Sequence, residues 1–126
     1  MPRKTSKHAL VAVSGNATDQ VIQAAWGPAV TPGTSTPTGR VRVLSLSVSG
    51  GSVPGTVQFN SKGGGAGTAI FGPFVPPTGT AVPLVIATAD DTAACVTNAG
   101  EALTVTTAGV TGTTLINIDY DFQPGF

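Results

Sequence analysis

The segment Leu115–Phe122 alternates between apolar and polar side chains without a break. Every second residue is apolar and points to one face of an extended chain, namely Ile116, Ile118, Tyr120 and Phe122. The residues between them are polar, namely Asn117, Asp119 and Asp121. A period of two predicts a β-strand that turns one face to a core and the other to water.

Helical periodicity is almost absent from the rest of the chain, and short β-prone segments separated by Gly, Pro and Thr take its place. The further predicted strands are Ala9–Ser14, Val21–Trp26, Arg40–Ser49, Gly55–Asn60, Thr68–Phe71, Ala81–Thr88 and Leu103–Thr107. About eight short strands without helices predict an all-β fold, a two-sheet antiparallel sandwich of jelly-roll-like form. With 126 residues, the chain is long enough for one such domain.

The predicted strand Arg40–Ser49 changes its phase part-way along. Its apolar residues are Val41, Val43, Leu44, Leu46 and Val48. The parity of these positions switches between Val43 and Leu44. Either a β-bulge at this point places all five on one face, or the strand leaves one sheet for another.

Charged residues are scarce and unevenly distributed. They make up 10% of the chain, against about 25% in an ordinary domain. The net charge is zero, yet residues 1–62 carry all six basic residues and only Asp19 as an acidic one, so the other acidic residues lie in 63–126. This separation favours association between identical copies, unless the two halves fold together and cancel locally.

Two segments lie outside the strand pattern. Residues 1–8 are basic and precede the first apolar run, so we expect an N-terminal arm followed by one sandwich domain, residues 9–126. Residues 27–39 form an uncharged loop with three prolines, a kind that is usually functional or lies against a partner. The apolar run 9–13 is shorter than a signal sequence requires, and no run approaches the ~20 residues of a membrane span. The sequence predicts a soluble protein made without a secretion signal.

Candidate catalytic and metal-binding groups are few. The single histidine, His8, lies at the end of the basic arm, which does not favour a Ser–His–Asp triad. Asp119 and Asp121 share a strand face, as an acid–base or calcium-binding pair would, but a solvated outer face explains them better. Cys95 is the single cysteine, which excludes an internal disulfide and a cysteine-based zinc site, and we expect it to be a small buried residue. The sequence predicts no enzyme, no metal site and no cofactor.

The stretch Asn60–Phe74, "NSKGGGAGTAIFGPF", contains the glycine-rich run Gly63–Gly67. A phosphate-binding loop places its lysine after the glycines and a helix behind them, whereas Lys62 precedes the glycines and a strand-like segment follows. We interpret the run as a flexible connection between two strands. Nucleic-acid binding is not predicted either, because Arg40 and Arg42 lack neighbouring aromatic residues.

The order of the motifs in residues 40–126 resembles a known family. "VRVLSLSVSG", "GTVQF", a glycine-rich turn, "GTAIFGPF" and "TNAGEALTVTT" follow one another before a last alternating strand. This order resembles the head decoration (cement) proteins of tailed bacteriophages and related small virion-surface β-sandwich proteins. The chain departs from their pattern between Phe74 and Asn98, where "DDTAACV" replaces an aromatic element.

The resemblance implies a non-enzymatic protein, made in the host cytoplasm, that binds the outer surface of a phage capsid and stabilises the shell. The implied partners are the major capsid protein and other copies of the chain, as a dimer or trimer. Candidate capsid contacts are Arg3, Lys4, Lys7, Trp26, Pro28, Pro32 and Phe126. The alternative is a receptor-binding or fibre-tip domain that recognises a host glycan. A carbohydrate-binding module or small hydrolase is the more distant alternative.

Overall fold

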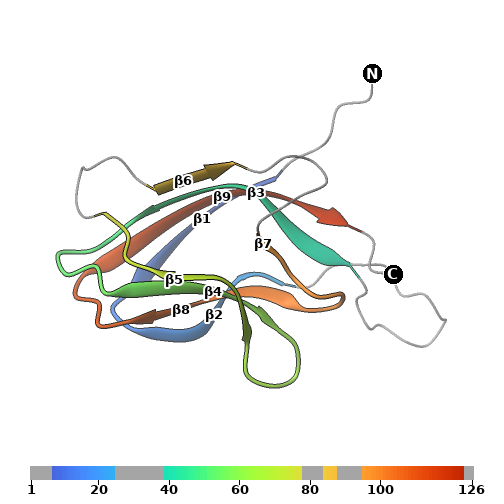
Figure 1. Cartoon of the computed structure of the whole chain (residues 1–126), viewed down its shortest axis with the longest axis horizontal. Helices are drawn as coiled ribbons and strands as arrows, with labels where there is room; N and C mark the ends of the chain where they lie inside the picture. Colours follow the sequence, from blue (N-terminus) through green and yellow to red (C-terminus); the bar gives the residue numbers. More distant parts are fainter. Residues whose placement is uncertain (1–6, 25–38, 78–83, 88–94, 124–126) are drawn as a thin grey trace.

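A computed structural model describes residues 7–24, 39–77, 84–87 and 95–123 (Figure 1). Within these residues the regular structure consists of strands. They are β1 (Lys7–Ser14), β2 (Ala17–Gln23), β3 (Arg40–Ser49), β4 (Thr56–Lys62), β5 (Thr68–Phe74), β6 (Leu84–Ala87), β7 (Cys95–Val96), β8 (Ala102–Ala108) and β9 (Thr113–Gln123).

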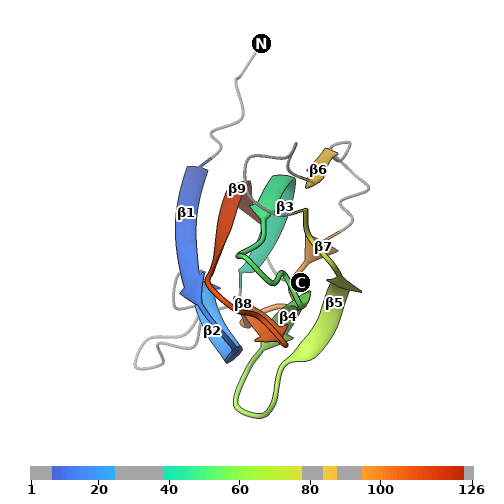
Figure 2. The ribbon, with the colours of Figure 1, turned by 90° about the vertical axis from the view of Figure 1, so that its left-hand side faces the viewer.

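The strands form two antiparallel sheets packed face to face (Figures 1 and 2). One sheet has the order β1-β9-β3-β6, and the two-residue strand β7 also pairs with β3. The other has the order β2-β8-β4-β5. The pairs β1 with β9, β2 with β8, β3 with β6 and β4 with β5 are those of a long hairpin rolled up, which is the jelly-roll arrangement. The predicted all-β, two-sheet antiparallel sandwich is confirmed.

The strand bounds differ from the predicted ones mainly at the N-terminal end of the chain. Strand β1 begins at Lys7, so Lys7 and His8 belong to the sheet and not to an arm that ends at residue 8. Strand β2 begins at Ala17, four residues before the predicted start at Val21, because the polar residues Thr18 and Asp19 hid its alternation. Strand β7 was not predicted.

The core lies between the two sheets and is almost entirely aliphatic. Its buried members are Val13, Ile22, Val41, Val43, Leu46, Val48, Val57, Phe59, Leu103, Val105, Ile116, Ile118 and Tyr120. The predicted core face of β9 is therefore confirmed, with Phe122 partly buried against the cluster. Phe59 is fully buried and lies 6.4 Å and 6.2 Å, ring centroid to ring centroid, from Phe71 and Phe74.

The phase change in β3 is a β-bulge. The strand pairs with β9 from Arg40 to Ser49, and its register shifts between Val43 and Ser45. The shift returns the apolar residues on both sides of it to the core face, so the strand stays in one sheet. The prediction that Leu44 shares this face is wrong, because Leu44 is the extra residue of the bulge and remains half-buried.

Candidate functional site

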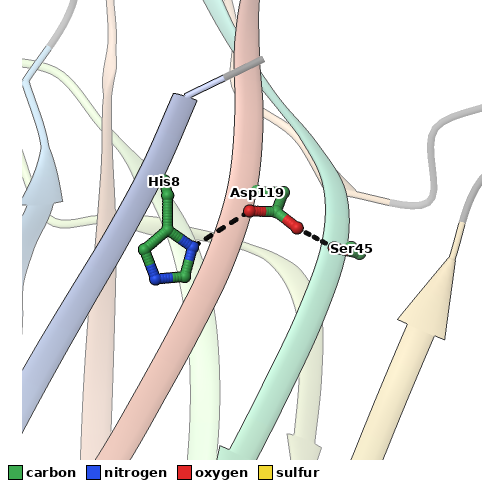
Figure 3. Close-up of polar contacts among 3 residues, drawn as sticks. All are labelled: His8, Ser45 and Asp119. Carbon is green, nitrogen blue, oxygen red and sulfur yellow. Dashed lines mark hydrogen bonds and ion pairs between the residues drawn. The ribbon is translucent and has the colours of Figure 1, made fainter.

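The one histidine contacts an aspartate on the outer face of the first sheet. His8 Nδ1 lies 3.0 Å from Asp119 Oδ1, and Ser45 Oγ donates to Asp119 Oδ2 at 2.9 Å (Figure 3). The three residues come from β1, β9 and β3, and the strand register places His8 opposite Asp119 and Asp119 opposite Ser45. They form a polar row across three neighbouring strands.

This row has the residue types of a hydrolytic triad but not its order of contacts. In a triad the imidazole accepts the proton of the serine hydroxyl, whereas here Ser45 and His8 bind different oxygens of one carboxylate. The side chains of His8 and Asp119 are 60% and 51% exposed. The hydrogen bonds from His8 and Ser45 lower the pKa of Asp119. An exposed contact of this kind contributes little to stability, and its geometry pairs no nucleophile with a base.

Asp121 lies in a different environment from Asp119. Arg42 Nε and Nη2 donate to its two carboxylate oxygens at 2.8 Å and 2.5 Å, and the side chains of Arg42 and Asp121 are 6% and 13% exposed. The prediction of a solvated outer face is therefore wrong for Asp121, although it holds for Asp119. Since the two aspartates bind different partners, the structure does not join them into one acid–base pair. The described residues contain no cluster of three His, Cys, Asp or Glu side chains suited to a metal ion.

Asp19 is the centre of a third polar group, on the outer face of the second sheet. Its φ of 50° places it in the left-handed region, where β2 shifts its register against β8. Its carboxylate accepts three hydrogen bonds of 3.0 Å, from Gly67 N, Asn60 Nδ2 and Thr104 Oγ1. The bond from the Gly67 amide, followed by those from Thr104 and Asn60, lowers the pKa of Asp19 against the opposing effect of burial.

The glycine-rich run is a β4–β5 connection that extends beyond the two sheets (Figures 1 and 2). Lys62 Nζ donates to Gly65 O at 2.6 Å, so the ammonium group binds the carbonyl of its own loop. At the far end, a Cβ on Gly67 would collide with the carboxylate of Asp19 and the side chain of Asn60. Glycine at this position therefore permits the close approach of Asp19, and the interpretation as a strand connection is confirmed.

The motif "TNAGEAL" joins the two sheets. Thr97 Oγ1 accepts a hydrogen bond from Val41 N at 2.8 Å, which fixes the segment to the first sheet. Glu101 Oε1 accepts from Ser61 Oγ at 2.6 Å and from Asn98 Nδ2 at 3.2 Å, which fixes it to β4 in the second. The contacts of this motif are therefore structural, because they connect the two sheets.

The candidate capsid contacts fall almost entirely on residues that the structure does not describe. Lys7 is exposed at the start of β1. The other candidates lie outside the described residues, namely Arg3, Lys4, Trp26, Pro28, Pro32 and Phe126. The same holds for the predicted loop up to residue 38 and for the side chain of Cys95.

Comparisons with known proteins do not assign this chain to a family. A scan against models of protein families, a search of curated proteins and a search of solved structures gave no significant match to this chain. Among the described residues there is no helix of the length and hydrophobicity needed to cross a membrane.

The contribution of Asp19 is testable with Asp19→Asn, because Asn tolerates a positive φ and changes mainly the charge. We expect the free energy of unfolding at pH 7 to fall by about 1–2 kcal/mol. The folded-state pKa of Asp19 lies below its unfolded value, so its stabilisation is present above about pH 4 and is lost as the pH falls through the folded pKa. Urea unfolding should show the difference between the two proteins shrinking from pH 5 to about pH 2.

Asp119→Asn is the matched control for this series. Its carboxylate is half exposed, so the same trend with pH should appear with a much smaller amplitude. A difference between Asp19→Asn and the unaltered protein that stays constant over the whole pH range would contradict the role given to the carboxylate.

Proposed function

We propose that the chain is a structural virion protein that binds the outer surface of a phage capsid as a decoration (cement) protein and stabilises the shell. The proposal rests on the resemblance of residues 40–126 to such proteins. The structural observation that supports it most is that charged side chains bind other groups of the same chain. The charged side chains that bind other parts of the same chain are Asp19, Arg40, Arg42, Lys62, Glu101, Asp119 and Asp121.

A surface whose charged groups are already hydrogen-bonded within the chain suits close packing against neighbours. Burying an unpaired charge in an interface costs far more than burying an apolar or satisfied polar group. Both outer sheet faces bear short uncharged residues, such as Ser47, Asn117 and Thr106, beside these internal contacts. A protein of this kind lies against a shell subunit or a second copy with little loss of hydration energy.

Binding in many copies then stabilises the shell without chemistry. A ligand that binds only the assembled shell shifts the equilibrium toward it by mass action. Each copy needs to supply only a few kcal/mol, because the effect is summed over all copies on one closed surface. The partners in this proposal are the major capsid protein and other copies of the chain.

The number of copies per particle tests the proposal against the fibre-tip alternative. A decoration protein is expected in hundreds of copies, and a fibre tip in a few to tens. Purified particles should therefore show the 12.4 kDa chain as one of the most abundant bands of a stained gel, next to the major shell protein. A band with the intensity expected for a few tens of copies would favour the receptor-binding role.

A further inference from the structure

Strand β1 differs from the other edge strands of the sandwich. It forms one end of the first sheet, and its eight residues pair one for one with β9 without a register shift. The second sheet ends in β2 and β5, which both contain register shifts, and β5 also contains Pro73. The other end of the first sheet is β6, with four residues. Bulges, proline, shortness and edge lysines are the usual means of preventing edge-to-edge pairing, and of these β1 has only Lys7, at its first position.

The backbone of β1 presents four residues to its open side. Gly15 N donates to Gly112 O at 2.8 Å, which continues the β1–β9 register by one pair. Because hydrogen-bonded pairs alternate along an antiparallel ladder, the odd-numbered residues of β1 bond to β9. The residues whose N–H and C=O groups point away from the sheet are His8, Leu10, Ala12 and Ser14. In the part of the chain that the structure describes, no strand pairs with this side of β1. Figure 2 shows β1 at one flank of the sandwich.

Two exposed large apolar side chains of the first sheet lie beside this edge. Leu10 is 63% exposed, and Leu115 on β9, which lies opposite the exposed Ala12, is 44% exposed. All three are on the outer face, since Val11 and Val13 on the same strand pack toward the core. An edge with open hydrogen-bonding groups and a small apolar patch favours the addition of another strand.

We propose that β1 pairs antiparallel with β1 of a second copy of this chain, with Val11 on the two-fold axis. In this register His8 lies opposite Ser14 of the second copy, and Leu10 lies opposite Ala12. All four outward-facing residues of each copy then make backbone hydrogen bonds, about eight in total for an antiparallel ladder of this length. The two Leu10 and two Ala12 side chains meet on the outer face, flanked by Leu115 from each copy.

The side chains of β1 are compatible with a second copy of the same strand, because Leu10 faces Ala12 and His8 faces Ser14 across the axis. The strand contains no carboxylate, and the antiparallel arrangement places the two Lys7 ammonium groups at opposite ends of the interface. One strand pair with a small apolar patch is smaller than the ~1,200 Å² of a standard stable interface, so the dimer is expected to be weak and concentration-dependent. The inference specifies the contact between copies within the proposed function, but it concerns the purified chain and is tested without any particle.

Sedimentation equilibrium over a range of concentrations tests the dimer. We expect Leu10→Lys to raise the dissociation constant about tenfold or more, because it places two like charges diagonally across the axis and a lysine on the edge. Val21→Lys is the matched control, since Val21 is 55% exposed on β2, an edge of the other sheet, and should leave the constant unchanged. A full-length chain that stays monomeric up to millimolar concentration would overturn the proposal. An equal increase in the dissociation constant for Leu10→Lys and Val21→Lys would overturn the choice of β1 as the pairing edge.

Disulfide cross-linking tests the register. In a Cys95→Ala background, Val11→Cys places one thiol from each copy on the axis, within the Cα separation that a disulfide allows. Oxidation should yield a covalent dimer that dithiothreitol reverses, whereas Val21→Cys in the same background should not. No covalent dimer from Val11→Cys, or equal amounts from both, would overturn the pairing. Association of the edge with isolated shell protein in preference to a second copy would also overturn it.

Discussion

Replacing Ile118 with alanine is expected to lower the free energy of unfolding by about 2–5 kcal/mol. Ile118 is 1% exposed in the middle of β9, where it faces the second sheet between β1 and β3. The substitution removes its buried methylene and methyl groups and leaves a cavity that the paired strands cannot close. Domains of this size are stable by about 5–15 kcal/mol, so chemical denaturation should show a large shift of the midpoint.

The neighbouring Asp119→Ala is the matched control. It changes the adjacent residue on the opposite face of the same strand, where the side chain is half exposed and paired with His8 and Ser45. The expected cost is below about 1 kcal/mol. If Ile118→Ala were benign while Asp119→Ala abolished binding of calcium or a sugar, both the strand phase and the structural role of this face would be wrong.

Asp121→Ala should cost about 3–5 kcal/mol, far more than Asp119→Ala, although both aspartates lie on the same face of β9. The substitution removes both hydrogen bonds from a guanidinium group that is 6% exposed. Because Arg42 stays in place, its buried guanidinium group loses the carboxylate of Asp121. Since the pair is shielded from solvent, the loss should persist at high salt.

A paired substitution separates the burial of charge from the loss of packing. Arg42→Met combined with Asp121→Leu replaces the ion pair with apolar groups and should recover most of the stability lost in Asp121→Ala. Urea unfolding of Asp121→Ala, of the double variant and of each of its two single substitutions measures this directly. If the double variant were as unstable as the losses from Arg42→Met alone and Asp121→Leu alone added together, the effect would come from packing and not from the broken ion pair.

Much of the fold could be predicted because its strands carry local patterns. The alternation in β9 identifies its core face, and the phase change in β3 indicates the bulge between Val43 and Ser45. Strand β7 could not be found this way, because two residues carry no periodicity. Its pairing depends on β3, which supplies both of its partners.

The polar groups were harder to predict, since their partners are distant in the chain. Asp19 binds Gly67 and Thr104, which are 48 and 85 residues away. The parity of β3 and β9 places Arg42 and Asp121 on outward faces, but parity does not report what covers a face. The single usable signal was their opposite charge on two strands that both belong to one sheet.

Thermal release of the genome from particles that lack this chain tests its role in the shell most directly. Without the chain, particles should assemble but release their genome at a lower temperature, or on dilution from magnesium, than particles that contain it. Adding back the purified protein should restore the release temperature in proportion to occupancy, because bound copies stabilise only the assembled shell. Particles that lack the chain and are equally robust, but fail to adsorb to cells, would contradict shell stabilisation and favour the fibre-tip alternative.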